Sequence, residues 1–241
     1  FDSKSRTWKL KEGVVDSSPL SDTPRPGNAK FKKLTPVDPN STNPYQLTEA
    51  DRTVIGNTTP KFSGGFGLNA TYKGFDMSMF FNFMYDFDVL NANKIMLTTW
   101  ADNKENNFLM DIASDKRWRN FDDMGNEIRY SPEVLAEFNK NATMWNPTSI
   151  GRPICMSYAV EDGSFLRLNS ATLGYTLPSV WTKKVGLSKV RFYVSGNNLF
   201  TLTGYSGYDP EVNIATGLTP NIDYDRYPRS RTYTFGAQLT F

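Results

Sequence analysis

The side chains that carry most covalent and zinc chemistry are almost absent from this sequence. It contains no histidine, and its one cysteine is Cys155. Zinc sites, Cys/His nucleophile pairs and histidine-assisted serine hydrolysis all need residues that are missing here. A disulfide within the chain is excluded for the same reason.

Two pairs of neighbouring acids, Asp122-Asp123 and Glu161-Asp162, remain as candidates for acid–base chemistry. Glycoside hydrolysis needs two carboxyl groups about 5 to 10 Å apart across a cleft. Adjacent acids on a loop are usually charged surface instead. We therefore predict no catalytic residue and expect that the chain is not an enzyme.

Oxygen ligands that could gather around a cation lie in the N-terminal part of the chain, at Asp38, Asn40, Glu49 and Asp51. Carboxylate and amide oxygens are the ligands that Ca²⁺ prefers. Acids that lie between prolines more often form solvated turns, however. We predict no metal and no cofactor, and keep Asp38 and Asn40 as weak candidates.

Aromatic side chains supply a different chemistry, the recognition of sugars or of a partner protein. Trp100, Trp118 and Trp145 could stack on sugar faces or pack against a lid protein, or they could form a small core of their own. A second group combines tyrosines with acids, which suits sugar binding but also describes ordinary surface loops. Its members are Tyr205, Tyr208, Tyr224 and Tyr227 beside Asp209, Glu211, Asp223 and Asp225.

The composition indicates strands with one apolar and one wet face. Aromatic residues make up 14% of the 241 residues, yet the hydrophobic fraction is 39% and the mean hydropathy is −0.50. No window approaches the roughly 18 to 20 apolar residues of a membrane-spanning helix. The formal net charge of +2 comes without a basic stripe, so nucleic acid is not an expected partner.

The elements that carry these residues follow from the alternation of apolar and polar side chains. Residues 1–60 are proline-rich and read as loop, with a short strand predicted from Arg6 to Lys11. Period-2 alternation then predicts a hairpin over 61–87, a second over 164–201 and a last strand over 231–241 that ends on Phe241. The segments 88–163 and 202–230 are polar excursions, and the first of them has helical turns near 92–100 and 132–140.

Short and long connections alternate along this chain, as they do in outer-membrane barrels. Five or six strands of about 11 to 14 residues would not close a barrel, because small barrels need about 8 strands. We expect the remaining strands upstream, and interpret Phe1, which no export signal follows, as a cut point. The alternative is a secreted or surface β-sandwich that binds carbohydrate.

Several segments resemble the late barrel of SusC-like (RagA-type) TonB-dependent transporters. They are residues 51–62 (DRTVIGNTTPKF), 66–68, 72–76, 164–178 (SFLRLNSATLGYTLP), 196–200 (GNNLF), 207–211 (GYDPE) and 227–233 (YPRSRTY). The resemblance implies an all-β fold: an antiparallel transmembrane barrel segment with long extracellular loops, within a barrel of about 22 strands. The segments 1–60, 88–163 and 202–230 would then lie outside the cell.

The resemblance also implies the partners and the location. Such transporters lie in the outer membrane of Gram-negative bacteria, contain a plug domain, are energised through TonB and work with a SusD-like lipoprotein. Their cargo is oligosaccharide or, less often, peptide. Phe241 would be a signal read by the barrel-insertion machinery, or simply one more lipid-facing side chain. Members often carry an acidic D-x-N-x-D-G loop before the DRTVIGN segment, and here Asp38 and Asn40 remain while the third acid and the glycine are absent.

Overall fold

The computed structural model describes residues 1–241 apart from 22, 100–106, 114, 212–219 and 225. The chain forms two compact units. The loop unit comprises Phe1–Ile55 and Ala92–Ala159, and the sheet unit comprises Gly56–Asn91 and Val160–Phe241. Among the described residues, no helix is both long enough and apolar enough to cross a membrane.

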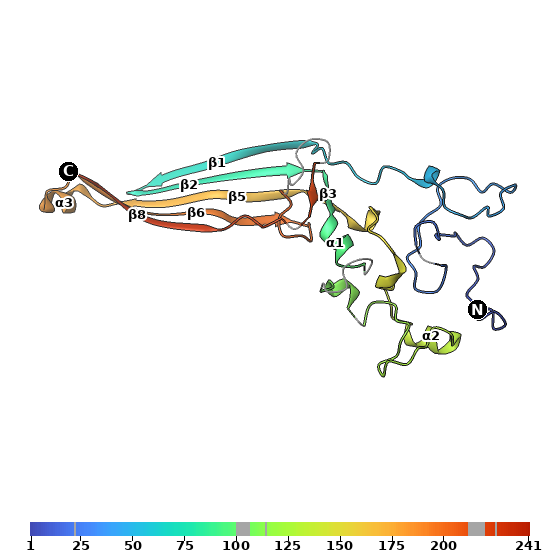
Figure 1. The fold of residues 1–241 in the computed structure, drawn as a ribbon. Coiled ribbons are helices and arrows are strands. Elements are labelled where there is room, and N and C mark those ends of the chain that lie inside the picture. Colours follow the sequence, from blue (N-terminus) through green and yellow to red (C-terminus); the bar gives the residue numbers. More distant parts are fainter. Residues whose placement is uncertain (22, 100–106, 114, 212–219, 225) are drawn as a thin grey trace. The chain divides into compact units, whose positions relative to one another are not determined.

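The sheet unit is built on five long antiparallel strands in the order β1-β2-β5-β6-β8 (Figure 1). Apolar side chains, many of them aromatic, alternate with small and polar ones along these segments, which favours a pleated strand. The predicted all-β, antiparallel architecture is therefore confirmed. The strands are β1 (Phe62–Tyr72), β2 (Phe75–Tyr85), β5 (Phe165–Thr176), β6 (Lys189–Thr203) and β8 (Thr232–Thr240).

The first hairpin turns at Lys73-Gly74, where both residues have positive φ, 45° and 90°. Two-residue turns with positive φ at both positions match the twist of the flanking strands. Pairing then runs without a shift from Tyr72↔Phe75 to Phe62↔Tyr85. The turn thus places the apolar positions of β1 directly opposite those of β2.

One face of this sheet is apolar across all five strands. Alternation and register together place the following residues on it: Phe62, Phe66, Leu68 and Tyr72 of β1; Phe75, Met77, Met79, Phe81, Phe83 and Tyr85 of β2; Leu166, Leu168, Leu173 and Tyr175 of β5; Phe192, Val194, Phe200 and Leu202 of β6; and Tyr233, Phe235 and Leu239 of β8. The opposite, polar face carries mainly Ser, Thr, Asn and Gly.

A bulge at Asn169 keeps the apolar face continuous. Ser170 pairs with Phe80 and Leu168 pairs with Phe81, so β5 has one residue more than β2 at this point. An extra residue reverses the alternation of the strand beyond it. Leu166 and Leu168 therefore share the face of Leu173, although their positions in the sequence have the opposite parity.

The end of the sheet that carries the long loops is capped within the sheet unit by a small mixed sheet. Its strands are β3 (Asp88–Asn91), β4 (Val160–Asp162) and β7 (Ile222–Asp223), in the order β4-β3-β7. Phe87, Val89, Phe165 and Tyr205 form a buried cluster there. At the other end, α3 (Ser179–Thr182) and the 3-10 turn Lys183–Val185 connect β5 to β6.

The loop unit is irregular, with a small core of Ala29, Ile150 and Met156. Helices form near both predicted positions: α1 (Ala92–Met96) and α2 (Pro132–Phe138). Shorter 3-10 turns occupy Glu49–Asp51, Met110–Ile112, Pro147–Ser149 and Ser157–Ala159.

The strand predicted from Arg6 to Lys11 does not form. The chain instead turns at Arg6, which has a φ of 51°, and makes an isolated bridge between Asp2 and Thr7. Trp8 donates its indole N–H to the carbonyl oxygen of Arg129 and packs against the ring of Phe1. The alternation was a misleading signal because no neighbouring strand pairs with these residues.

Candidate functional site

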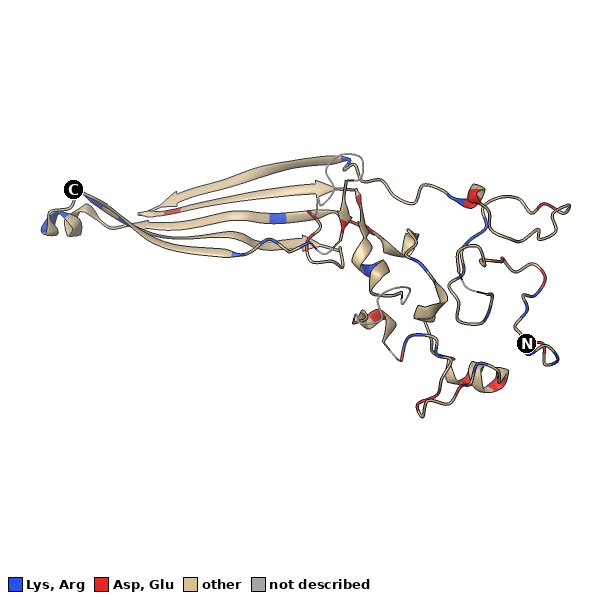
Figure 2. Cartoon of the chain, viewed as in Figure 1, with Lys and Arg blue, Asp and Glu red and all other residues tan. Residues whose placement is uncertain are grey.

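The apolar face of the sheet is the largest candidate functional surface of the described chain. Many of its side chains are exposed, such as Phe235 by 80%, Tyr72 by 68% and Leu202 by 60%, whereas Leu168 is buried. The five strands carry four charged residues, Asp76, Arg167, Lys189 and Arg191, so the strands are almost free of charge (Figure 2). Register places all four on the polar face. Within the sheet unit, no second described sheet is packed over these exposed residues, as a β-sandwich would require.

The polar face carries an ion pair that spans three strands. Arg191 of β6 donates from Nε to Oδ1 of Asp76 on β2 at 2.9 Å, and its Nη2 donates to the other carboxylate oxygen. Gly174 of β5 lies between them, and a Cβ built there would come within 2.4 Å of the guanidinium group. The absence of a side chain at Gly174 is what lets the two residues meet.

Tyr205 and Asp223 meet in the cap at the long-loop end. Tyr205 is 6% exposed, and its hydroxyl donates to Oδ2 of Asp223 at 2.7 Å. Burial, with the hydrogen bond to Asp223 as the next cause, raises the pKa of the Tyr205 hydroxyl above its usual range. Tyr205 is therefore a support of the cap and not an accessible contact residue.

Glu161 organises the same cap from β4. Its carboxylate accepts hydrogen bonds from the backbone N–H of Ser206 at 2.9 Å and from the Ser206 hydroxyl at 2.8 Å. The side-chain amide of Asn91 donates to it at 3.3 Å. Its neighbour Asp162 accepts from the backbone N–H and the hydroxyl of Ser164. Both acids thus hold backbone in place, which is a structural role.

A buried charge network fastens the start of the second polar excursion to β5. Arg167 is 2% exposed and donates to Oδ1 of Asp209, which is 8% exposed. Glu211 lies 3.6 Å from Arg167 and 3.0 Å from Arg229, measured between charged nitrogen and oxygen atoms. The acids of the GYDPE motif therefore bind arginines of the protein itself.

The remaining tyrosines of this region stand in solvent. Tyr208 is 83% exposed, Tyr227 is 87% exposed and Tyr224 is 49% exposed. Asp225, also predicted here, lies outside the described residues. Of the predicted tyrosine–acid group, these three aromatic rings are the accessible members.

The predicted tryptophans that the structure describes are packed against other residues of the loop unit. Trp118 packs on Gly27, where a Cβ would come within 2.1 Å of its ring. Trp145 packs on the core of the loop unit and meets Tyr158 edge to face at 4.8 Å between ring centroids. Trp100 lies outside the described residues. Trp118 and Trp145 thus each pack on other residues of the loop unit.

The candidate cation ligands do not converge. Asp38 accepts a hydrogen bond from the backbone N–H of Asn40 at 2.9 Å in a local turn. The described residues contain no group of three or more acids or cysteines that could hold a metal ion.

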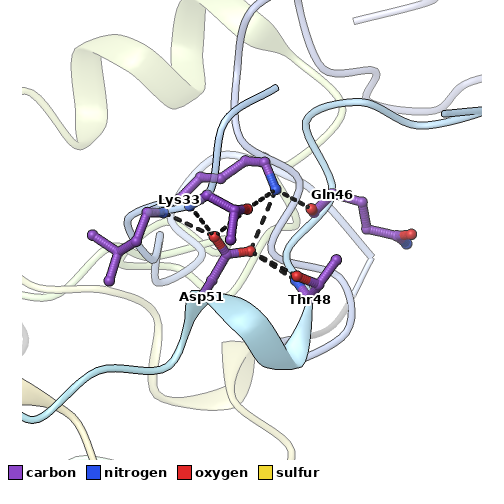
Figure 3. A network of polar contacts seen from close by, with 6 residues as sticks. Lys33, Gln46, Thr48 and Asp51 are labelled. Atoms are coloured by element: carbon purple, nitrogen blue, oxygen red, sulfur yellow. Dashed lines mark hydrogen bonds and ion pairs between the residues drawn. The ribbon is translucent and has the colours of Figure 1, made fainter. Parts of the chain in front are cut away.

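Asp51 is saturated by donors of the chain itself (Figure 3). Its carboxylate accepts from the backbone N–H groups of Leu34, Thr35 and Thr48 at 2.8, 2.7 and 2.9 Å. The ammonium group of Lys33 lies 3.3 Å away, and the Asp51 side chain is 4% exposed. The hydrogen bonds, led by that from the Thr35 backbone, hold the pKa of Asp51 well below its usual range. A protein ammonium thus supplies the positive charge beside this carboxylate.

Three further predicted residues have clear surroundings. Phe241 follows β8 and is 90% exposed. Asp122 accepts hydrogen bonds from Asn126 and from the backbone N–H of Met124, and Asp123 pairs with Arg119 at 2.7 Å. Asp122 therefore stabilises a turn.

Sequence reasoning missed the arginines. A lone arginine within an alternating strand is a detectable signal: Arg191 alternates with Val190, Phe192 and Val194, whereas Arg167 reaches the polar face only through the bulge at Asn169. The identity of the partner acid is not detectable, because Asp76 is 115 positions from Arg191 and Asp209 is 42 from Arg167.

Comparison with known proteins confirms the resemblance predicted from the motifs. The chain is 34% identical over 236 residues to TonB-dependent receptor P3 of Formosa agariphila, a match that covers 95% of this chain and 20% of the relative. It is 36% identical over 88 residues to TonB-dependent receptor SusC of Bacteroides thetaiotaomicron, covering 35% of this chain and 8% of SusC. No protein-family model matches. The chain thus spans about a fifth of the length of the first relative.

Solved structures show the same fold. The structure of the RagAB peptide transporter matches with a TM-score of 0.58 and 24% identity, over 78% of this chain and 18% of that chain. The RagAB peptide importer in the open-open state matches with a TM-score of 0.58 and 23% identity, over 97% of this chain and 25% of that chain. The five-stranded sheet is accordingly part of a larger barrel.

Proposed function

We propose that this chain, similar along almost its whole length to a TonB-dependent receptor, is a wall segment of a SusC-like importer in the outer membrane of a Gram-negative bacterium. The observation that carries the proposal is the uncharged, exposed apolar face that continues across five strands. Water would disfavour such a face on a soluble protein. Lipid provides the surroundings that this face requires.

Strand length supports this assignment. Each of β1 and β2 has 11 residues. At about 3.3 Å per residue, such a strand is about 36 Å long. Tilted by about 45°, it rises about 25 Å, which is the height of the apolar band of outer-membrane barrels.

The long segments 1–60, 88–163 and 202–230 are placed on the cell exterior in this proposal, and the short connections on the periplasmic side. Tyr208, Tyr224 and Tyr227 are the members of the predicted tyrosine–acid group whose rings are accessible, so we assign contact with cargo or with a SusD-like lid to them. Trp118, Trp145 and Tyr205 would support those loops from within. Phe241 would serve barrel insertion, as predicted.

The rest of the machinery would lie in parts of the protein outside this chain. A plug domain, a TonB-contact segment and the remaining strands belong to that region in the proposal. Cargo would be oligosaccharide or peptide, a choice that SusC-type and RagAB-type relatives leave open. Since the acid pairs Asp122-Asp123 and Glu161-Asp162 are engaged with the chain itself, we assign them no catalytic role.

The barrel assignment is tested by placing a charge on each face of the same strand. In the full-length parent protein, Phe235→Arg would put a cation on the lipid side and Thr234→Arg would put it on the lumen side. An arginine facing lipid costs about 2 to 4 kcal/mol near the midplane. We expect Phe235→Arg to reduce the heat-modifiable, folded band on SDS gels and Thr234→Arg to retain it. An equal amount of the folded band in the two variants would contradict the proposal that this sheet is a membrane wall.

Cargo contact is tested separately. Tyr208→Ala and Tyr224→Ala in the full-length protein should weaken binding of an oligosaccharide or peptide panel, measured by calorimetry. Tyr233→Ala, on the apolar face, is the matched control and should bind as the unmodified protein does. Unchanged affinity in both loop variants would remove these tyrosines from the contact surface.

A further inference from the structure

The connection between β5 and β6 exposes its apolar residues and buries a polar one. Val180 is 68% exposed, Trp181 is 60% exposed and Val185 is 70% exposed, whereas Thr182 is 2% exposed. A short helical turn in water would normally do the reverse. The segment Ser179–Val185, here called the interfacial turn, therefore needs an apolar neighbour that the described chain does not supply.

The interfacial turn is fixed in position. The backbone N–H of Leu177 donates to the carbonyl of Val190 at 2.9 Å, and that of Ser188 donates to the carbonyl of Thr240 at 2.8 Å. The end of β5 is thereby bonded to β6, and the start of β6 is bonded to the end of β8, directly beside the turn. Figure 1 shows α3 at the end of the sheet opposite β3, beside the C-terminus. The exposed side chains are thus presented at a defined height relative to the strands.

Positive charge accompanies the exposed apolar groups. Lys183, Lys184 and Lys189 lie in or directly after the turn, and the sequence contains no acid from position 163 to position 208. The nearest acid on a neighbouring strand, Asp76, is already paired with Arg191. Lys73, at the other short connection, lies over the ring of Tyr72 at 5.2 Å. The short-connection end of the sheet is accordingly cationic.

The turn is also continuous with the apolar face. Aromatic rings form a row across neighbouring strands at this end, where Phe75 pairs with Tyr175 and Tyr175 with Phe192. The rings of Phe75 and Tyr175 are 4.5 Å apart. Aromatic belts with adjacent lysines are typical of the boundary between hydrocarbon and headgroups, where the ring is partly immersed and the ammonium reaches the lipid phosphates.

We propose that the interfacial turn is a binding site for anionic phospholipid on the short-connection side of the membrane. Val180, Trp181 and Val185 enter the boundary of the leaflet, and Lys183 and Lys184 bind the headgroup phosphates. The inference rests on the proposed membrane wall, and it adds a lipid preference that the wall alone does not require. A lipid phosphate fits better than free phosphate because the lysines flank exposed apolar side chains.

The test uses the full-length parent in nanodiscs, with Cys155→Ser and any further cysteines replaced. An environment-sensitive fluorophore is attached at Trp181→Cys, with Val185→Cys as a second position. Phe235→Cys and Thr234→Cys report the two faces of β8. Lipids with a nitroxide near the headgroup quench a fluorophore that lies at the boundary, and lipids with a nitroxide on the chain quench one that lies deeper.

We expect quenching at positions 181 and 185 by the shallow nitroxide, quenching at 235 by the deeper one, and none at 234. Quenching at 235 without any at 181 and 185 would overturn the lipid site and leave the membrane wall intact. No quenching at 235 would overturn the wall itself. The two failures are thus distinguishable.

The charge requirement is measured in the same system. Shallow quenching at 181 should increase when phosphatidylglycerol replaces part of the phosphatidylcholine, and Lys183→Gln/Lys184→Gln should abolish that increase. The matched control Lys30→Gln/Lys32→Gln removes two cations from the loop unit and should retain it. Loss of the increase on adding inorganic phosphate at constant ionic strength would indicate a free-phosphate site and overturn the lipid assignment, as would an increase that survives Lys183→Gln/Lys184→Gln.

Discussion

Arg191 of β6 passes over Gly174 and pairs with Asp76 of β2, so that one ion pair bridges three strands of the sheet. Both partners lie on the polar face near the short-connection end. A two-pronged contact of this kind restricts the relative sliding of strands that are not direct neighbours.

We predict that Asp76→Asn and Arg191→Gln each lower the melting temperature of the full-length barrel, because each leaves one charge without its partner. The double variant Asp76→Asn/Arg191→Gln should melt no lower than the less stable of the two single variants, because all three lose the same interaction. Thermal melts followed by circular dichroism measure this. Fully additive losses would show that the two residues act independently.

Substitution of one member of the buried pair Arg167 and Asp209 should lower stability more than substitution of Asp76 or Arg191. Removal of one partner from a buried pair costs about 3 to 5 kcal/mol, because the other charge stays desolvated and alone. Asp209→Asn is therefore expected to destabilise the folded barrel and to increase proteolysis of the segment 202–230. Arg167→Met/Asp209→Leu, which removes both charges, should recover much of the stability. A double variant as unstable as Asp209→Asn would contradict this account.

Gly27 provides a test of packing in the loop unit with a matched control. Gly27 and Gly125 both have a φ of 83°, but a Cβ at Gly27 would come within 2.1 Å of the Trp118 ring, whereas one at Gly125 would meet nothing within 4 Å. Gly125→Ala should cost about 1 to 2 kcal/mol from backbone strain alone. Gly27→Ala should cost about 1 to 3 kcal/mol more from overpacking. Equal losses in denaturant titrations would show that Trp118 moves aside freely.

The stability of the segment that Asp51 holds should depend on pH. The folded-state pKa of Asp51 is held below the ordinary value of 3.8, so its contribution to stability is complete above that value and is lost as the pH falls toward the folded-state pKa. Protection of the Leu34 and Thr35 amides against hydrogen exchange should fall with acidification in this range. Asp51→Asn should show weaker protection at neutral pH and a flatter profile. An identical profile in both proteins would exclude Asp51 as the cause.

Much of the sheet was predictable because local alternation reports it directly. Phe62 to Tyr72 and Phe75 to Tyr85 alternate without interruption, and Lys73-Gly74 marks the turn, so both strands and their common apolar face could be assigned. The bulge at Asn169 could not, because a reversal of parity is visible only against a partner strand. The strand expected from Arg6 to Lys11 does not form, because alternation makes a strand only where a partner strand is present, and a partner cannot be seen in the local sequence.

The candidate site was less predictable than the strands. Tyr205 and Tyr208 are three positions apart and look alike in the sequence, yet one is 6% exposed and the other 83%. Trp118 and Trp145 were recognised as aromatic groups, but their places on Gly27 and in the core beside Tyr158 depend on segments far away in the chain.

The sequence by itself determined which chemically active residue types this chain lacks and where its apolar and polar side chains alternate, because residue identity and period-2 spacing are local properties. Only the tertiary structure decided which acids are neutralised, which tyrosines stay accessible and where the charged residues meet. Those outcomes depend on contacts such as Asp76 with Arg191 and Arg167 with Asp209, which form between residues distant in the chain once the strands are in register.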